Sequence, residues 1–132
     1  MSLPENKSYS AQMLHRGAMN DAKVAREANT RGDKDSEQKS WEWALESELK
    51  ALNYLLSDSR DPIDSPNIIL FSKHAAIYAD NTGDKQMALK LLKDALARDP
   101  DPKTRDELLR LIADMQSPLN AASEQSVGGS MA

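Results

Sequence analysis

The sequence predicts an all-α protein of five helices and no strand. Apolar residues recur at spacings of three and four over residues 9–116, which is the period of an amphipathic helix. The breaks in this pattern carry glycine, aspartate and proline, which end helices and cap the ones that follow. Aromatic residues are only 5% of the chain, fewer than a β-sandwich or barrel normally needs.

The first two helices are predicted at residues 9–30 and 37–56, with Gly32 ending the first in a left-handed conformation. Asp33, Asp35 or Ser36 can cap the second helix. The apolar face of the first helix is sparse, and its members are Met13, Ala18, Ala22, Ala25 and Ala28. The stripe of the second helix is Trp41, Leu45, Leu49, Leu52 and Leu56.

Residues 57–65 are predicted to form a loop, after which Ser65 caps a third helix with Pro66 in its first turn. That helix extends to residue 82, before Gly83. Asp84 starts a fourth helix, which ends before residues 99–100. Residues 101–102, Asp-Pro, open a fifth helix whose stripe is Leu108, Leu111, Ile112 and Met115.

The length of 132 residues fits one domain, which we expect at 9–116. Residues 1–8 are polar and predict a flexible leader, and the small, polar residues 117–132 predict a disordered tail.

The two predicted helix pairs share an internal repeat. Residues 28–34 resemble residues 79–85 at an offset of 51, and the Ala-Leu pairs at 44 and 51 match those at 88 and 95 at an offset of 44. The two offsets differ by seven residues, about two helical turns, so the longer second helix keeps the same face buried. Helices approach closely where such small side chains meet, which predicts two equivalent helical hairpins.

Residues 76–100 resemble a tetratricopeptide repeat, because small residues, a Gly-Asp turn, Ala-Leu pairs and a closing Asp-Pro fall at the spacing of that family. The resemblance covers residues 67–100, and residues 103–116 suit the helix that caps such arrays. It implies a right-handed α-α superhelix of two hairpins plus a C-terminal capping helix. The first hairpin departs from the pattern, since it is longer and carries Glu48 where the second has Leu92. An ordinary five-helix bundle with a chance Gly-Asp turn is the alternative.

The resemblance implies a non-catalytic protein–protein interaction module or scaffold that binds a peptide or partner protein in a groove. The groove positions transferred by resemblance are Lys23, Arg26, Asn29, Leu70, Lys73, His74, Ile77 and Asn81. Four cationic or potentially cationic groups among them suggest an acidic segment or a C-terminal carboxylate as partner. Because two repeats are fewer than isolated arrays usually contain, self-association as a homo-oligomer is also expected.

Trp43 cannot share a face with Trp41, since two residues are about 200° apart on a helix. We expect it either to pack on the first helix or to act as an exposed anchor for a partner. A helical-bundle regulatory subunit or small-ligand-binding domain, with a closed pocket between the first two helices, is the alternative function.

The sequence gives no positive support for an enzyme, a metal site or a cofactor. It has no cysteine, and its two histidines, His15 and His74, lie far apart and are expected on helix faces. Glu48 is the one acid predicted to face inward; if buried, it is either paired with a lysine or arginine or part of a site. A net charge of -4 disfavours nucleic acid and anionic membranes as partners. With no apolar run long enough for a signal or a membrane span, we expect a soluble, cytoplasmic protein.

Overall fold

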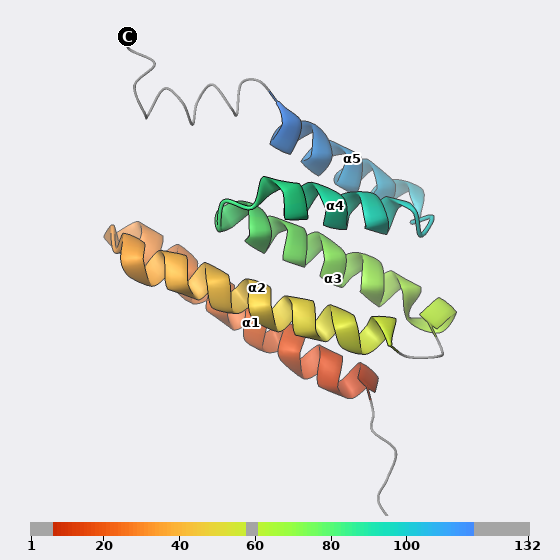
Figure 1. The fold of residues 1–132 in the computed structure, drawn as a ribbon, viewed down its shortest axis with the longest axis horizontal. Helices are drawn as coiled ribbons and strands as arrows, with labels where there is room; N and C mark the ends of the chain where they lie inside the picture. The colour runs from red at the N-terminus through yellow and green to blue at the C-terminus, as the bar shows by residue number, and fades with distance from the viewer. Residues whose placement is uncertain (1–6, 58–60, 118–132) are drawn as a thin grey trace, which may run out of the picture.

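The computed structural model describes residues 7–57 and 61–117. Figure 1 shows the helices stacked one on another in chain order, and each packs against the helix that precedes it. The described residues form five helices and no strand, which confirms the predicted all-α class: α1 (Lys7–Arg31), α2 (Lys34–Leu56), α3 (Asp61–Asn81), α4 (Lys85–Leu96) and α5 (Pro102–Gln116). Most of the predicted leader and tail lie outside the described residues.

The α1–α2 and α3–α4 hairpins close with the same turn. Gly32 and Gly83 both have positive φ, at 76° and 95°, where residues with a Cβ are strained. The next residue is an aspartate in each turn, and its backbone N–H donates to the carbonyl of an alanine five residues earlier, at 2.9 Å in both. The same aspartates, Asp33 and Asp84, cap α2 and α4 by accepting a backbone N–H three residues on. The repeated turn is therefore equivalent in backbone conformation and in hydrogen bonding.

Alanines line the helix contacts as the sequence predicted. Ala76 and Ala88 are fully buried and Ala95 is 1% exposed, and all three belong to the apolar cluster that joins α3, α4 and α5. A second cluster brings alanines of α1 and α2 together with Trp41 and Tyr78. With no side chain beyond Cβ between them, paired helix backbones can approach closely.

Two predicted helix starts were wrong. α2 begins at Lys34, because Asp33 rather than a later residue caps it. α3 begins at Asp61, so the expected loop is shorter and Pro66 lies inside the helix instead of in its first turn. Pro62 occupies the second position of α3, where its fixed φ suits a helix start and its missing N–H costs nothing.

The buried faces of α1 and α2 differ from the predicted stripes at several positions. Met13 is 50% exposed and Leu56 is 45% exposed, so neither belongs to the core. His15, which is 7% exposed, takes a place on the alanine face of α1. On α2 the buried face is rotated toward Ala44, Glu48, Ala51 and Leu55. On this face Ala44 and Ala51 meet alanines of α1, and such small side chains allow the two helices to approach closely.

The turn glycines provide a test of the repeated turn. Replacing Gly32 or Gly83 with alanine should each lower the free energy of unfolding by about 1–2 kcal/mol, because a Cβ is strained at positive φ. Gly17 lies within α1 with open space around its Cα, so Gly17→Ala should instead raise it by about 0.5–1 kcal/mol. Urea denaturation followed by circular dichroism measures all three. A stabilising Gly83→Ala would contradict the turn geometry.

Candidate functional site: a buried histidine–glutamate cluster

One acid is fully buried among the residues whose burial the structure describes. Glu48 lies in the middle of α2 and is 0% exposed. Its counterpart at the offset of 44 is Leu92 on α4, which is also 0% exposed and packs in an apolar cluster. The same position of the two hairpins therefore holds a hydrocarbon side chain in one and a carboxyl group in the other.

The partner of Glu48 is His15 of α1, 33 residues away in sequence. The His15 Nδ1 lies 2.9 Å from one carboxylate oxygen and 2.8 Å from the other. The ring of Phe71 on α3 stacks on the His15 imidazole, with 4.3 Å between the ring centroids and an interplanar angle of 17°. Sequence analysis allowed a buried Glu48 either a lysine or arginine partner or a place in a site; its partner in the structure is a histidine.

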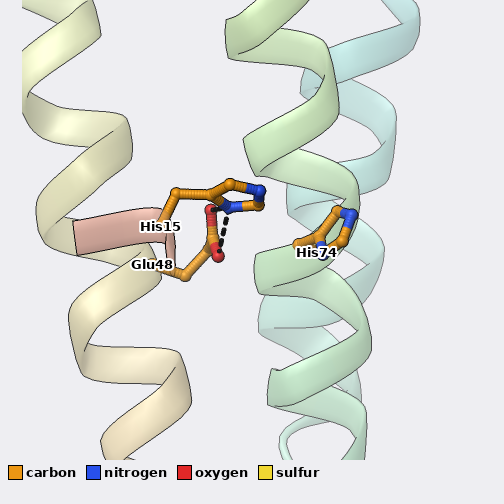
Figure 2. Close-up of side chains that lie close together, drawn as sticks. All are labelled: His15, Glu48 and His74. Carbon is orange, nitrogen blue, oxygen red and sulfur yellow. Dashed lines mark hydrogen bonds and ion pairs between the residues drawn. The ribbon is translucent and has the colours of Figure 1, made fainter. Parts of the chain in front are cut away.

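His74 of α3 completes the cluster. Its ring meets that of His15 edge to face, with 5.0 Å between centroids, and its Nδ1 lies 3.3 Å from the Tyr78 hydroxyl oxygen. The side chain is half-buried, whereas His15 and Glu48 are buried. Figure 2 shows the three side chains close together, with the dashed lines joining His15 to both oxygens of Glu48.

Burial controls the acid–base properties of the cluster. Loss of water raises the pKa of Glu48, while the hydrogen bond and the charge of His15 act in the opposite direction. Burial, followed by the charges of His15 and nearby cations, lowers the pKa of His74 to about 4. Burial also raises the pKa of the Tyr78 hydroxyl to about 12. At neutral pH His74 is therefore a neutral imidazole and Tyr78 a neutral phenol.

The cluster has the side chains of a metal site. One ligand atom from each of His15, Glu48 and His74 can be chosen so that all three lie within 4.8 Å of one another. Two imidazoles and a carboxylate are ligands that zinc and other divalent transition metals accept. The same groups can also hold and pass a proton, so their arrangement is open to both kinds of chemistry.

Sequence analysis missed this cluster because its members come from three helices. His15 and His74 were expected as separate residues on helix faces, and the fold brings them into contact. One signal was present: His15 lies on the same face as Ala11, Ala18 and Ala22, at spacings of four, three and seven residues. His15 lies among alanines, and Glu48 stands where the second hairpin has Leu92. Polar residues at such apolar positions indicate a pair that faces the core.

The predicted groove residues lie on α1 and α3, and several already have partners within the protein. Lys73 Nζ pairs with Glu107 of α5 at 3.0 Å, and the Arg26 guanidinium lies 5.5 Å from the centre of the Trp41 ring. The Asn29 amide donates to Glu37, and the Asn81 amide donates to the backbone carbonyl of Ile77. Lys23 is exposed and Ile77 is half-buried. With His74 neutral and Lys73 paired, the predicted groove carries less net positive charge than the sequence suggested.

Trp43 lies on α2 and is 58% exposed, which corrects the expectation that it packs into the first helix. Its exposure leaves it available as an anchor for a partner. It is not among the residues that line the cavity described next.

A cavity of about 470 Å³ lies beside the N-terminal half of α3. Leu70 and Lys73 of the predicted groove contribute to it, together with the turn between α4 and α5 and with Thr104 of α5. A smaller cavity of about 330 Å³ lies between α2, α3 and α4. Neither has a wall from α1, so neither is the closed α1–α2 pocket that the alternative function would use.

Comparisons of the chain with protein-family models, with curated proteins and with solved structures found no match. Among the residues that the structure describes, no helix has the length and apolar character needed to cross a membrane.

The low pKa of His74 predicts a pH-dependent stability. The folded pKa of about 4 lies below the ordinary 6.5, so the contribution of this group is complete above pH 6.5 and is lost as the pH falls toward 4. After discounting for the half-exposed ring, we expect a loss of about 1–2 kcal/mol over that interval.

The His74→Gln variant isolates this effect. The raised pKa of Glu48 makes the protein more stable as the pH falls, but it does so in wild type and variant alike, so it cancels when the two are compared. The difference in unfolding free energy between wild type and variant should move in favour of the variant as the pH falls. Urea denaturation at pH 7, 5.5 and 4 measures it. A difference that does not change with pH would contradict the assigned titration.

Proposed function

We propose that this protein is a non-catalytic helical-repeat module that binds a peptide or partner protein in a groove between α3 and the turn that joins α4 to α5. The repeated turn and the buried alanines support the repeat architecture from which this function was inferred. The observation that carries the proposal is the cavity beside α3. Leu70 and Lys73, two positions that the family resemblance places in the groove, both line it.

The cavity combines surfaces that suit a peptide. Ile69, Leu70 and Pro100 supply apolar walls, Lys73 and Arg98 supply cationic groups, and Asp99 and Asp101 supply acidic ones. Leu70 is 37% exposed, more than a leucine at a helix contact would be. An extended segment with one apolar anchor and a carboxylate fits this mixture of groups.

A random peptide library selected on the immobilised protein tests the proposal. Peptides that bind the wild type should lose at least tenfold in affinity for Leu70→Asp, because a carboxylate then replaces the apolar wall. The matched control is Leu109→Asp on α5, since Leu109 is similarly exposed at 44% but does not line the cavity. Circular dichroism verifies that both variants fold.

Peptides that bind wild type, Leu70→Asp and Leu109→Asp equally would place binding elsewhere and contradict the proposed groove. Failure to enrich any peptide over repeated rounds would also count against a peptide-binding function. Trp43→Ala provides a further comparison, because loss of binding in this variant alone would assign the interaction to the exposed face of α2.

A further inference from the structure

All the imidazole groups of this protein lie in one place. The sequence has two histidines and no cysteine, and both histidines belong to the cluster around Glu48. The other acids for which the structure shows a salt bridge are partly or largely exposed, and each pairs with a lysine or an arginine. The strongest nitrogen ligands for a transition metal thus lie beside the fully buried carboxylate of Glu48.

The Glu48 carboxylate has spare capacity to bind a cation. An ionised carboxylate offers about four lone-pair positions. Among the described residues the donor within hydrogen-bond distance is His15 Nδ1, which both oxygens share. The fold does not require a carboxyl group at this position, because Leu92 fills the equivalent position of the second hairpin. A buried acid with one shared donor is costly unless a further positive group or a proton joins it.

We propose that Glu48, His15 and His74 bind one divalent transition-metal ion of the zinc type, through a carboxylate oxygen and one nitrogen of each imidazole. Two histidines and one glutamate form a three-ligand set that leaves a fourth position for water or another ligand. Nitrogen ligands favour zinc and its neighbours over magnesium and calcium, which prefer oxygen.

The geometry requires only small movements of the ligands around the ion: His15 and Glu48 separate slightly, and His74 moves inward. Metal–ligand bonds of about 2.0–2.2 Å in a tetrahedron place ligand atoms roughly 3.3–3.5 Å apart. The His15 and Glu48 atoms are already closer than this, and the set of three lies within 4.8 Å. His74 is the half-buried member, so its ring can shift inward and its side of the cluster provides the route for the ion.

The groups around the cluster suit this role. Phe71 stacks on His15 and fixes the plane of its ring, and the Tyr78 hydroxyl lies beside His74 Nδ1. Such outer contacts orient metal-binding histidines and affect affinity.

The test uses the full chain without a histidine tag, freed of metal with a chelator. Calorimetric titration with Zn²⁺ should give one site per chain, and Co²⁺ should give the visible absorption bands of a four- or five-coordinate nitrogen–oxygen site. Because loss of a group that merely orients a ligand costs about 10- to 100-fold in affinity, His74→Gln and Glu48→Gln should each weaken binding at least tenfold. The control is Glu46→Gln, an exposed acid two residues away on α2, which should bind as the wild type does.

His74→Gln keeps the proposal testable if Glu48→Gln fails to fold, because His74 is half-buried and outside the His15–Glu48 pair. Absence of saturable binding by the wild type overturns the proposal, and so does equal affinity in His74→Gln. Histidine ring NMR gives an independent result. Both sets of ring signals should shift together at one equivalent of Zn²⁺, and a shift of neither or of only one contradicts a shared site.

Discussion

Replacing His15 with alanine is expected to lower the free energy of unfolding by about 3–5 kcal/mol at pH 7, the usual cost of breaking a buried acid–base pair by removing one partner. The variant leaves Glu48 at 0% exposure without the Nδ1 that now contacts both its oxygens. It also removes the ring on which Phe71 stacks. Urea denaturation monitored by circular dichroism measures the change.

The size of this effect should depend on pH. Burial raises the pKa of Glu48, and His15 is the group that opposes the rise, so its loss moves the pKa of Glu48 further upward. An acid whose folded pKa exceeds its unfolded pKa stabilises the protein below the unfolded pKa and loses that contribution as the pH rises through the folded one. The deficit of His15→Ala should therefore shrink as the pH falls from 7 toward 4.

A double variant separates the pair from its surroundings. His15→Leu with Glu48→Leu removes both polar groups and fills the space with hydrocarbon, as Leu92 does in the second hairpin. Such replacements of buried pairs are often neutral or stabilising by about 1–4 kcal/mol, so the double variant should be at least as stable as the wild type. If it is as unstable as His15→Ala, the pair is needed for the fold itself, and the inference that the carboxyl group is retained for another purpose is wrong.

Placing an acid at the equivalent position of the second hairpin is expected to have a larger effect still. Leu92→Glu should lower the free energy of unfolding by about 4 kcal/mol or more, because it removes a buried leucine and introduces an unpaired charge. Leu92 is 0% exposed, and the cluster around it is made of apolar side chains. Against a total stability of about 5–15 kcal/mol, this loss removes roughly a quarter to four-fifths of the free energy of unfolding.

The control for this variant is Gln86→Glu, which adds the same charge on the exposed face of α4. It should change the unfolding free energy by less than about 0.5 kcal/mol. Thermal melts followed by circular dichroism compare the two. If Leu92→Glu proves as stable as Gln86→Glu, the core around Leu92 tolerates an unpaired acid, and the special position of Glu48 loses its support.

The sequence alone determined the helical class, the turns and the helix contacts made by alanine. Helical periodicity, the Gly-Asp pairs at 32–33 and 83–84 and the aspartate caps act within a few residues, so they can be found by their spacing. Ala76, Ala88 and Ala95 were predicted to face other helices, and they are buried. The late start predicted for α3 was wrong because two prolines offered competing helix starts, and the earlier one is used.

Only the tertiary structure determined the His15–Glu48–His74 cluster. Glu48 lies 33 residues after His15 in the sequence, and His74 lies 59 residues after it. No local pattern specifies which faces of α1, α2 and α3 meet. The contact depends on the rotation of α2, which alanines set by allowing close approach to α1, so that Glu48 turns inward while Leu56 turns to solvent. Small side chains select the rotation of a helix because they allow its backbone to lie close to a neighbouring helix. This selection takes effect only when the helices pack against each other, so a local sequence pattern does not contain it.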